Sequence, residues 1–209
     1  MKMNVLRKAA VLCLAALMGF ALCGAACAAL PRTYAEFKAR YQTEGKTPRG
    51  AVKMYFEAVF AYLNESTRAE AGKMLRYALH SDMPIERSHN YSTFAERLRD
   101  PAYAYIFRSF AAGTSPENSY AMSPEDFELV FENAWEDPGG YLRVGLRSSG
   151  ADSPRVVWVK DYDGLWYVIN NAATYVDVRR PKSDLDARKN AHDADYDPGE
   201  SLLDRPAGP

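Results

Sequence analysis

Residues 127–178 place the tightest constraint on the fold, because short runs of alternating apolar and polar residues are separated there by turn sequences. In the first run, 127–135, the large apolar side chains share one face and two glutamates share the other: Phe127, Leu129, Phe131 and Trp135 against Glu128 and Glu132. Such alternation is typical of a β-strand that buries one face.

The same pattern predicts three further strands. Turns rich in Asp, Pro and Gly separate the runs 141–148, 155–160 and 165–178. In the first of these runs, the inward side chains are expected to be Leu142, Val144 and Leu146. The sequence therefore predicts a curved antiparallel β-meander.

The residues before the meander predict helices. Thr47 and Pro48 are suited to the N-cap and the first position of a helix over 48–63. This helix is apolar almost all round, so it must be nearly surrounded by protein. We expect it to fill the concave side of the sheet.

Shorter helices are predicted on both sides of this one. Tyr34, Phe37 and Tyr41 have helical spacing, which predicts a short helix within residues 30–46. Two capping-box patterns predict helices that end near residues 79 and 100, and they are formed by Thr67 with Glu70 and by Thr93 with Glu96.

The segment between these helices and the meander predicts one more strand. In residues 103–110, Tyr103, Tyr105 and Phe107 alternate with smaller or polar residues, as in a strand. Residues 113–124 contain two prolines and a glycine and are predicted to form a loop.

The N-terminus has the three parts of a secretory signal peptide. Basic residues precede an apolar run over 9–21, and Ala26-Cys27-Ala28 provides a cleavage site. The run is shorter than the roughly 20 residues that span a bilayer. Cleavage after residue 28 therefore predicts a periplasmic or secreted protein without a stable membrane span.

The three cysteines all lie in this N-terminal segment, so the cleaved chain would contain no disulfide. Lipid attachment through Cys23 or Cys27 is the alternative reading. Lipoprotein signals usually place Leu three residues before the lipidated cysteine, where this chain has Phe20 and Gly24. Signal cleavage is therefore preferred.

The C-terminus beyond residue 181 contains few large apolar residues, and such a composition predicts a disordered tail. The sequence thus divides into a signal peptide, an N-terminal extension, an α+β domain and a tail: 1–28, 29–46, 47–180 and 181–209. After signal removal, 23 basic residues face 27 acidic ones. No basic cluster with interleaved aromatics is present, which argues against nucleic-acid binding.

Three segments carry a resemblance to known proteins: 113–118, 148–154 and 164–168, with the sequences Gly-Thr-Ser-Pro-Glu-Asn, Ser-Ser-Gly-Ala-Asp-Ser-Pro and Gly-Leu-Trp-Tyr-Val. They resemble an uncharacterised family of bacterial secreted domains, over about residues 47–180. Helices followed by a curved sheet also look like the cone-shaped α+β fold of the nuclear transport factor 2-like superfamily. That superfamily includes isomerases, dehydratases, cyclases and ligand-binding modules, so the resemblance implies a fold and no particular activity.

Two motifs before the sheet are candidate sites. Gly45-Lys46-Thr47 ends like a phosphate-binding loop, but Arg40 stands where that loop requires glycine, and a capped helix explains the sequence better. His80, Asp82 and His89 could supply acid–base chemistry or metal ligands. Their spacing fits no zinc pattern, so we interpret them as a surface loop.

Acidic residues later in the chain form two further candidates. Glu128 and Glu132 share a strand face and could act as an acid–base pair if buried, although a solvated face is preferred. Asp193, Asp195 and Asp197 resemble part of a calcium loop whose glycine falls one residue late. We therefore predict neither a metal nor a cofactor.

The abundant aromatic residues are the remaining functional signal, because an incompletely filled cone would line an apolar pocket with them. The candidate pocket residues are Tyr55, Tyr62, Tyr103, Phe107, Trp158 and Trp166. We expect a non-catalytic extracytoplasmic module that binds a small apolar ligand or a protein partner, a homodimer included. The alternative is a pocket enzyme of the isomerase or dehydratase type that uses a buried Asp, Glu or His.

Overall fold

The computed structural model describes residues 29–189 and 191–192. The predicted signal peptide and Asp193, Asp195 and Asp197 lie outside these residues. The described α-helices are α1 (Tyr34–Glu44), α2 (Pro48–Leu63), α3 (Arg68–Ala78), α4 (Ser92–Arg99), α5 (Ala104–Arg108) and α6 (Lys182–Arg188). None of them is long and apolar enough to cross a membrane.

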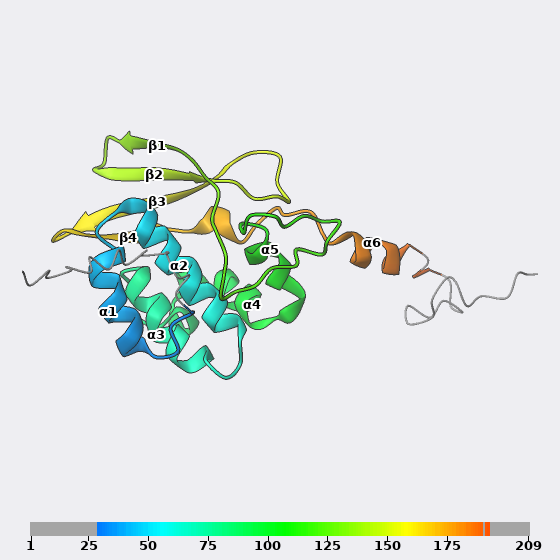
Figure 1. Cartoon of the computed structure of the whole chain (residues 1–209), viewed down its shortest axis with the longest axis horizontal. Helices are drawn as coiled ribbons and strands as arrows, with labels where there is room; N and C mark the ends of the chain where they lie inside the picture. Colours follow the sequence, from blue (N-terminus) through cyan, green and yellow to red (C-terminus); the bar gives the residue numbers. More distant parts are fainter. Residues whose placement is uncertain (1–28, 190, 193–209) are drawn as a thin grey trace, which may run out of the picture.

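The four described strands form one antiparallel sheet in the order β1–β2–β3–β4. They are β1 (Phe131–Asp137), β2 (Tyr141–Leu146), β3 (Arg155–Tyr162) and β4 (Leu165–Asn170). The helices α1 to α5 precede the strands and gather on one side of the sheet (Figure 1). The prediction of an α+β fold with N-terminal helices and an antiparallel meander is confirmed.

Helix α2 begins as its sequence predicts. The Thr47 side chain accepts a hydrogen bond from the Gly50 backbone N–H at 3.0 Å, and Pro48 occupies the first helical position. Gly50 is required because a Cβ there would lie 1.9 Å from the Glu44 carbonyl oxygen. The α1–α2 junction is therefore too close for any side chain at position 50.

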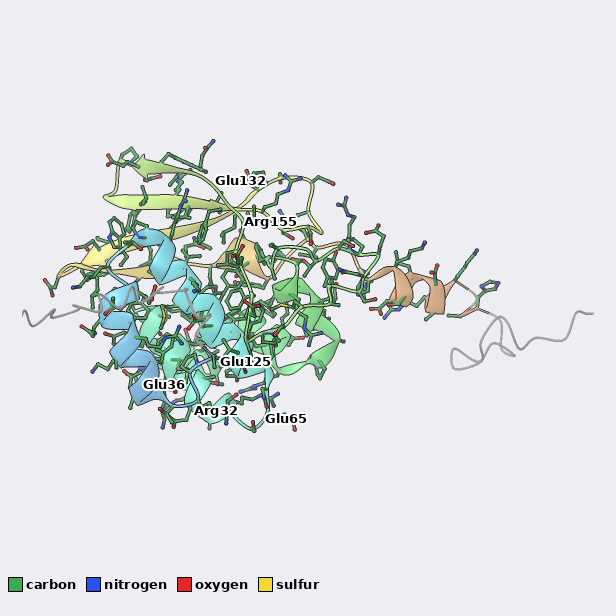
Figure 2. The ribbon with its side chains drawn as sticks, viewed as in Figure 1. Arg32, Glu36, Glu65, Glu125, Glu132 and Arg155 are labelled. Atoms are coloured by element: carbon green, nitrogen blue, oxygen red, sulfur yellow. The ribbon has the colours of Figure 1, made fainter. Side chains whose placement is uncertain are left out.

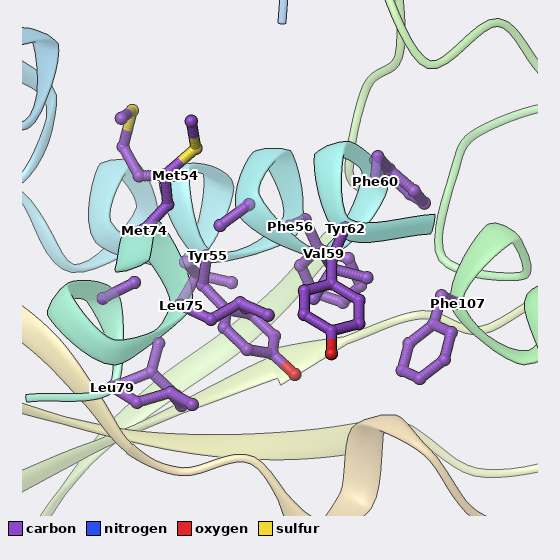
Figure 3. Close-up of a cluster of buried hydrophobic side chains, with 14 of the residues drawn as sticks. Met54, Tyr55, Phe56, Val59, Phe60, Tyr62, Met74, Leu75, Leu79 and Phe107 are labelled. Atoms are coloured by element: carbon purple, nitrogen blue, oxygen red, sulfur yellow. The ribbon is translucent and has the colours of Figure 1, made fainter. Parts of the chain in front are cut away.

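The core lies between α2 and the inner face of the sheet. Eleven of the sixteen residues of α2 are buried, and large side chains of α2, α3 and α5 meet beside the sheet (Figure 3). The sheet contributes a row of fully buried aliphatic residues: Val144, Leu146, Val157, Val159 and Val168. Burial of this apolar surface is the main stabilising contribution to the fold.

Helices α3 and α4 form where expected, but neither of the two predicted capping boxes is present. The Thr67 hydroxyl donates to the Ala61 carbonyl at 2.5 Å instead of capping α3. Glu70 accepts the Tyr34 backbone N–H at 2.8 Å, which ties α3 to the start of α1. In α4, Thr93 lies inside the helix, because Tyr91 is the N-cap residue.

The prediction of a strand over residues 103–110 is wrong, because this segment is helical. A 3-10 turn over Pro101–Tyr103 leads into α5, and the Asp100 carboxylate accepts the Ala102 N–H at 2.9 Å to start it. Phe107 and Phe110 are buried in the core. Alternation over only a few residues does not distinguish a strand from a short helix.

The ends of two strands also differ from prediction. β1 begins at Phe131. Between Phe131 and Ala134, two residues of β1, Glu132 and Asn133, oppose the single Gly145 of β2, which is a β-bulge. The bulge breaks the alternation, so Trp135 is 42% exposed instead of pointing inward. β4 ends at Asn170, eight residues early, because residues 172–174 turn into a 3-10 helix.

Candidate functional site

A groove of about 840 Å³ opens between α1, α3, the loop after α3 and β4. Its lining residues are Tyr34, Lys73, Arg76, Tyr77, His80, Ser81, Asp82 and Tyr167. We call this the tyrosine groove. Its volume falls within the roughly 300–1,000 Å³ of typical small-molecule sites.

The floor of the tyrosine groove is a packed set of phenol rings. Tyr77 stands edge-on to Tyr41 and to Tyr167, with ring centroids 5.1 and 5.6 Å apart, and Tyr41 stacks on Tyr167 at 5.4 Å. Edge-to-face and offset arrangements are favourable for aromatic pairs. Because α1, α3 and β4 each contribute one of these rings, the floor is fixed by three elements.

Hydrogen bonds connect the phenol groups. The Tyr77 hydroxyl accepts from the Gln42 side-chain amide at 3.1 Å and from the Tyr167 hydroxyl at 3.3 Å. Burial raises the pKa of Tyr167, and the neighbouring Tyr77 adds to the effect. Tyr167 therefore stays a neutral hydrogen-bond donor throughout the physiological pH range.

His80 stands at the rim of the groove in an unusual backbone conformation. Its φ is +47°, and it follows the C-cap residue Leu79. The His80 N–H bonds to the Tyr77 carbonyl and the Ser81 N–H to the Arg76 carbonyl, both at 3.0 Å. This is a Schellman motif, in which glycine usually occupies the position held by His80.

The imidazole ring of His80 is held between aromatic side chains. It lies parallel to the Tyr162 ring at a centroid distance of 4.2 Å, and it contacts the Tyr167 ring at 4.8 Å. A left-handed conformation costs a non-glycine residue about 1–2 kcal/mol. The ring contacts offset part of this cost, since such aromatic pairs contribute about 0.5–1.5 kcal/mol.

Charged side chains of both signs border the groove. Lys73 forms an ion pair with Glu70, which holds the pKa of that carboxyl below its usual range. Arg76 donates to the backbone carbonyls of Ser81 and Asp82 at 3.4 and 2.5 Å, fixing the loop after α3. The side chain of Asp82 is exposed on that loop.

The candidate pocket residues from the sequence do not gather in one place. Tyr55 and Phe107 are fully buried in the core, and the Tyr55 hydroxyl lies 2.9 Å from the Thr174 hydroxyl. Tyr62 donates to Glu86 at 2.8 Å and lines a neighbouring cavity of about 520 Å³, which shares Lys73 and Arg76 with the tyrosine groove.

The other three occupy further positions. Tyr103 lies beneath the Arg97 guanidinium on α4, and Trp158 beneath that of Arg143 on the sheet. Trp166 is partly buried, and its backbone N–H donates to the Gly45 carbonyl at 2.8 Å. None of these six residues lines the tyrosine groove.

Among the polar candidates, His80 and Asp82 line the tyrosine groove, whereas His89 lies in a separate 3-10 turn. Glu128 is exposed. Glu132 lies on β1 (Figure 2), and its carboxylate is 3.6 Å from the Arg147 guanidinium. Gly45-Lys46-Thr47 forms the capped start of α2, as preferred from the sequence.

Sequence reasoning missed most of the groove. On α3, Met74, Leu75 and Ala78 form the buried inner face. The neighbouring stripe of Lys73, Tyr77 and His80 has a helical spacing that could have indicated a second functional face. The spacing on α3 could not indicate that Tyr34 of α1 and Tyr167 of β4 complete the groove.

The fold and the groove define a small α+β domain with a polar and aromatic surface site. Over residues 29–182 the chain matches the family described as a domain of unknown function, DUF6935, and it belongs to that family. The expectation of an uncharacterised family is thereby confirmed, and the match includes α1. No curated protein and no solved structure matches the chain significantly.

Proposed function

We propose that this protein is a non-catalytic extracytoplasmic binding module whose ligand site is the tyrosine groove. The observation that carries the proposal is the arrangement of Tyr34, Tyr77 and Tyr167 with charged groups at the rim of one groove. Apolar walls with a few placed polar groups are the usual character of a small-molecule site.

The rigidity of the groove supports binding by a preformed site. The rings of Tyr41, Tyr77 and Tyr167 contact one another, and Tyr41 donates to the Trp166 carbonyl at 2.8 Å. A preformed site loses less conformational entropy on binding than a flexible one. A small ligand therefore suits this groove better than a protein partner, which would require a larger surface.

The experiment is ligand-observed NMR screening of the protein against a library of small soluble compounds. We expect hits that shift the amide signals of Tyr77, His80 and Tyr167, and that bind less well to a Lys73→Ala variant. Lys46→Ala removes an exposed lysine outside the groove and is the matched control. Hits that map elsewhere, or an absence of hits, would refute the proposal.

A pocket enzyme is the second candidate, because His80 and Asp82 line the same groove. Histidine is the side chain best suited to exchange protons near neutral pH. Both residues are exposed, however, whereas an isomerase or dehydratase of the expected type needs a buried acid or base. Turnover of a bound compound that disappears in His80→Ala would favour the enzyme over the binding module.

Export is part of the proposal, and it is supported by the signal pattern of residues 1–28. Intact-mass measurement of protein from the cell envelope and the medium should show no species that retains Met1. A lipid mass on an N-terminal Cys23 or Cys27 would replace this proposal with membrane anchoring.

We further propose that the domain is a variant of the nuclear transport factor 2-like cone. The support is the order of its elements, with helices first and a four-stranded antiparallel meander packed on α2. Superposition of an experimental structure on members of that superfamily tests the proposal, and an unrelated connectivity would overturn it.

A further inference from the structure

We propose that the tyrosine groove binds a neutral sugar, in the form of a mono- or short oligosaccharide; this rests on the proposed function. Three properties of the groove lead to this ligand class: its charges balance, it offers both hydrogen-bond donors and acceptors, and its apolar surface consists of ring faces.

The balance of charge argues against an ionic ligand. Of the two cations that line the groove, Lys73 is paired with Glu70, and Arg76 donates to the backbone carbonyl of Asp82. The carboxylates of Glu70 and Asp82 thus match the two cations in number. Sites that select anions or cations present an excess of the opposite sign. This groove presents no such excess, so its ligand is expected to be uncharged.

The hydrogen-bonding groups favour a ligand that both donates and accepts. The Tyr77 hydroxyl accepts two hydrogen bonds, from Gln42 and Tyr167, which leaves its own hydrogen available for a ligand. Arg76 and Lys73 add donors, and the Asp82 carboxylate adds an acceptor. Hydroxyl groups can satisfy both kinds of partner at once.

The aromatic surface suits the C–H faces of a sugar ring. Tyr34 and Tyr77 are partly exposed, and their rings meet edge-on at 6.0 Å. The electron-rich face of an aromatic ring attracts the weakly positive hydrogens of a C–H face. A sugar ring combines such a face with a rim of hydroxyls, as this groove requires.

His80 adds a further ring to the lining of the groove. Glycine would fit its φ of +47° without strain, yet the chain places there a ring that stacks on Tyr162 beside the groove. We assign the His80 ring to the wall against which the sugar packs.

The experiment applies the protein, expressed from its full-length sequence, to an array of neutral and anionic glycans, followed by NMR titration with the best neutral glycan. We expect binding to a neutral glycan that shifts the amide signals of Tyr77, His80 and Tyr167. His80→Gly, which keeps the backbone conformation and removes the ring, should weaken binding at least tenfold. Tyr77→Phe, which removes the hydroxyl, should weaken it at least threefold.

The control is His89→Ala, which removes a histidine outside the groove and should bind as the parent protein does. Thermal melts of all variants establish that each is folded. Binding unaffected by both groove substitutions, or binding to anionic glycans alone, would overturn the sugar assignment. If no glycan binds while library compounds still occupy the groove, the sugar assignment fails and the binding function stands; if nothing binds there, both fail.

Discussion

At the scale of single residues, the most unusual group is the carboxylate of Glu57 in the middle of α2. It is 2% exposed, and its Oε1 accepts a hydrogen bond from the Arg40 guanidinium at 2.9 Å. Its Oε2 is buried without a hydrogen-bond partner among the described residues. Burial raises the pKa of Glu57, although Arg40 and Lys53 oppose the shift.

The raised pKa makes stability depend on pH. The folded protein holds the Glu57 proton more tightly than the unfolded chain does, so protonation of Glu57 stabilises the folded state. This contribution to the free energy of unfolding is complete below the unfolded pKa and is lost as pH rises through the higher folded pKa. Urea denaturation between pH 4 and pH 8 should show this loss in the parent protein. In Glu57→Gln this loss of stability with rising pH should be absent. An identical dependence of unfolding free energy on pH in both proteins would contradict a raised pKa of Glu57.

A second residue-scale prediction concerns the Tyr55 hydroxyl, which lies inside the core (Figure 3). It lies 2.9 Å from the Thr174 hydroxyl and accepts from the Asn171 amide at 3.1 Å. Tyr55→Phe leaves the buried amide without this acceptor, so unfolding free energy should fall by about 1–3 kcal/mol. Tyr141→Phe on the outer face of the sheet is the control and should change it by less than about 0.5 kcal/mol.

At the scale of elements, β4 is held on one face and at its edge by α1 and its C-cap residue. Adjacent residues of a strand point to opposite faces, so Val168 faces the core with Val159, while Tyr167 points the other way and stacks on Tyr41 of α1. At the edge of β4, the Trp166 backbone N–H donates to the Gly45 carbonyl.

Two helical glycines give opposite predictions. Gly50→Ala places a Cβ against the Glu44 carbonyl, so it should shift the α1–α2 junction and lower the thermal midpoint markedly. Gly72 in α3 has ordinary space, with Glu86 at 3.4 Å, so alanine there should add about 0.5–1 kcal/mol of stability. Thermal melts of the two variants test this directly, and a destabilised Gly72→Ala would refute the second expectation.

Local patterns in the sequence predicted elements better than the contacts between them. The strands β2 and β3 and the helix α2 follow from alternation, turn residues and a helix cap, all of which act within a few residues. The bulge in β1 interrupts the alternation from which that strand was predicted. Helix α5 was missed because its contacts, such as that of Phe107 with Phe94, form only in the folded chain. The groove was missed because its residues lie far apart in sequence and meet only in the folded chain.

At the scale of the whole molecule, the two ends of the described chain contribute unequally. α1 inserts Phe37 and Tyr41 into the core, and both are fully buried. α6 instead projects away from the helices and sheet (Figure 1), and its Leu185 is 54% exposed. The contacts that fasten it are a few hydrogen bonds, such as that from the Lys182 N–H to the Pro116 carbonyl.

These contacts lead to a prediction for two truncated chains, both lacking residues 1–28. Removal of residues 29–45 deletes two buried aromatic side chains, each of which contributes about 3–5 kcal/mol. Because natural domains are stable by only about 5–15 kcal/mol, this chain should lose cooperative unfolding. Removal of residues 182–209 should lower the thermal midpoint by less than about 4 °C, equivalent to roughly 1 kcal/mol. A cooperative chain without α1, or a large loss without α6, would show that the stabilising contacts are distributed differently.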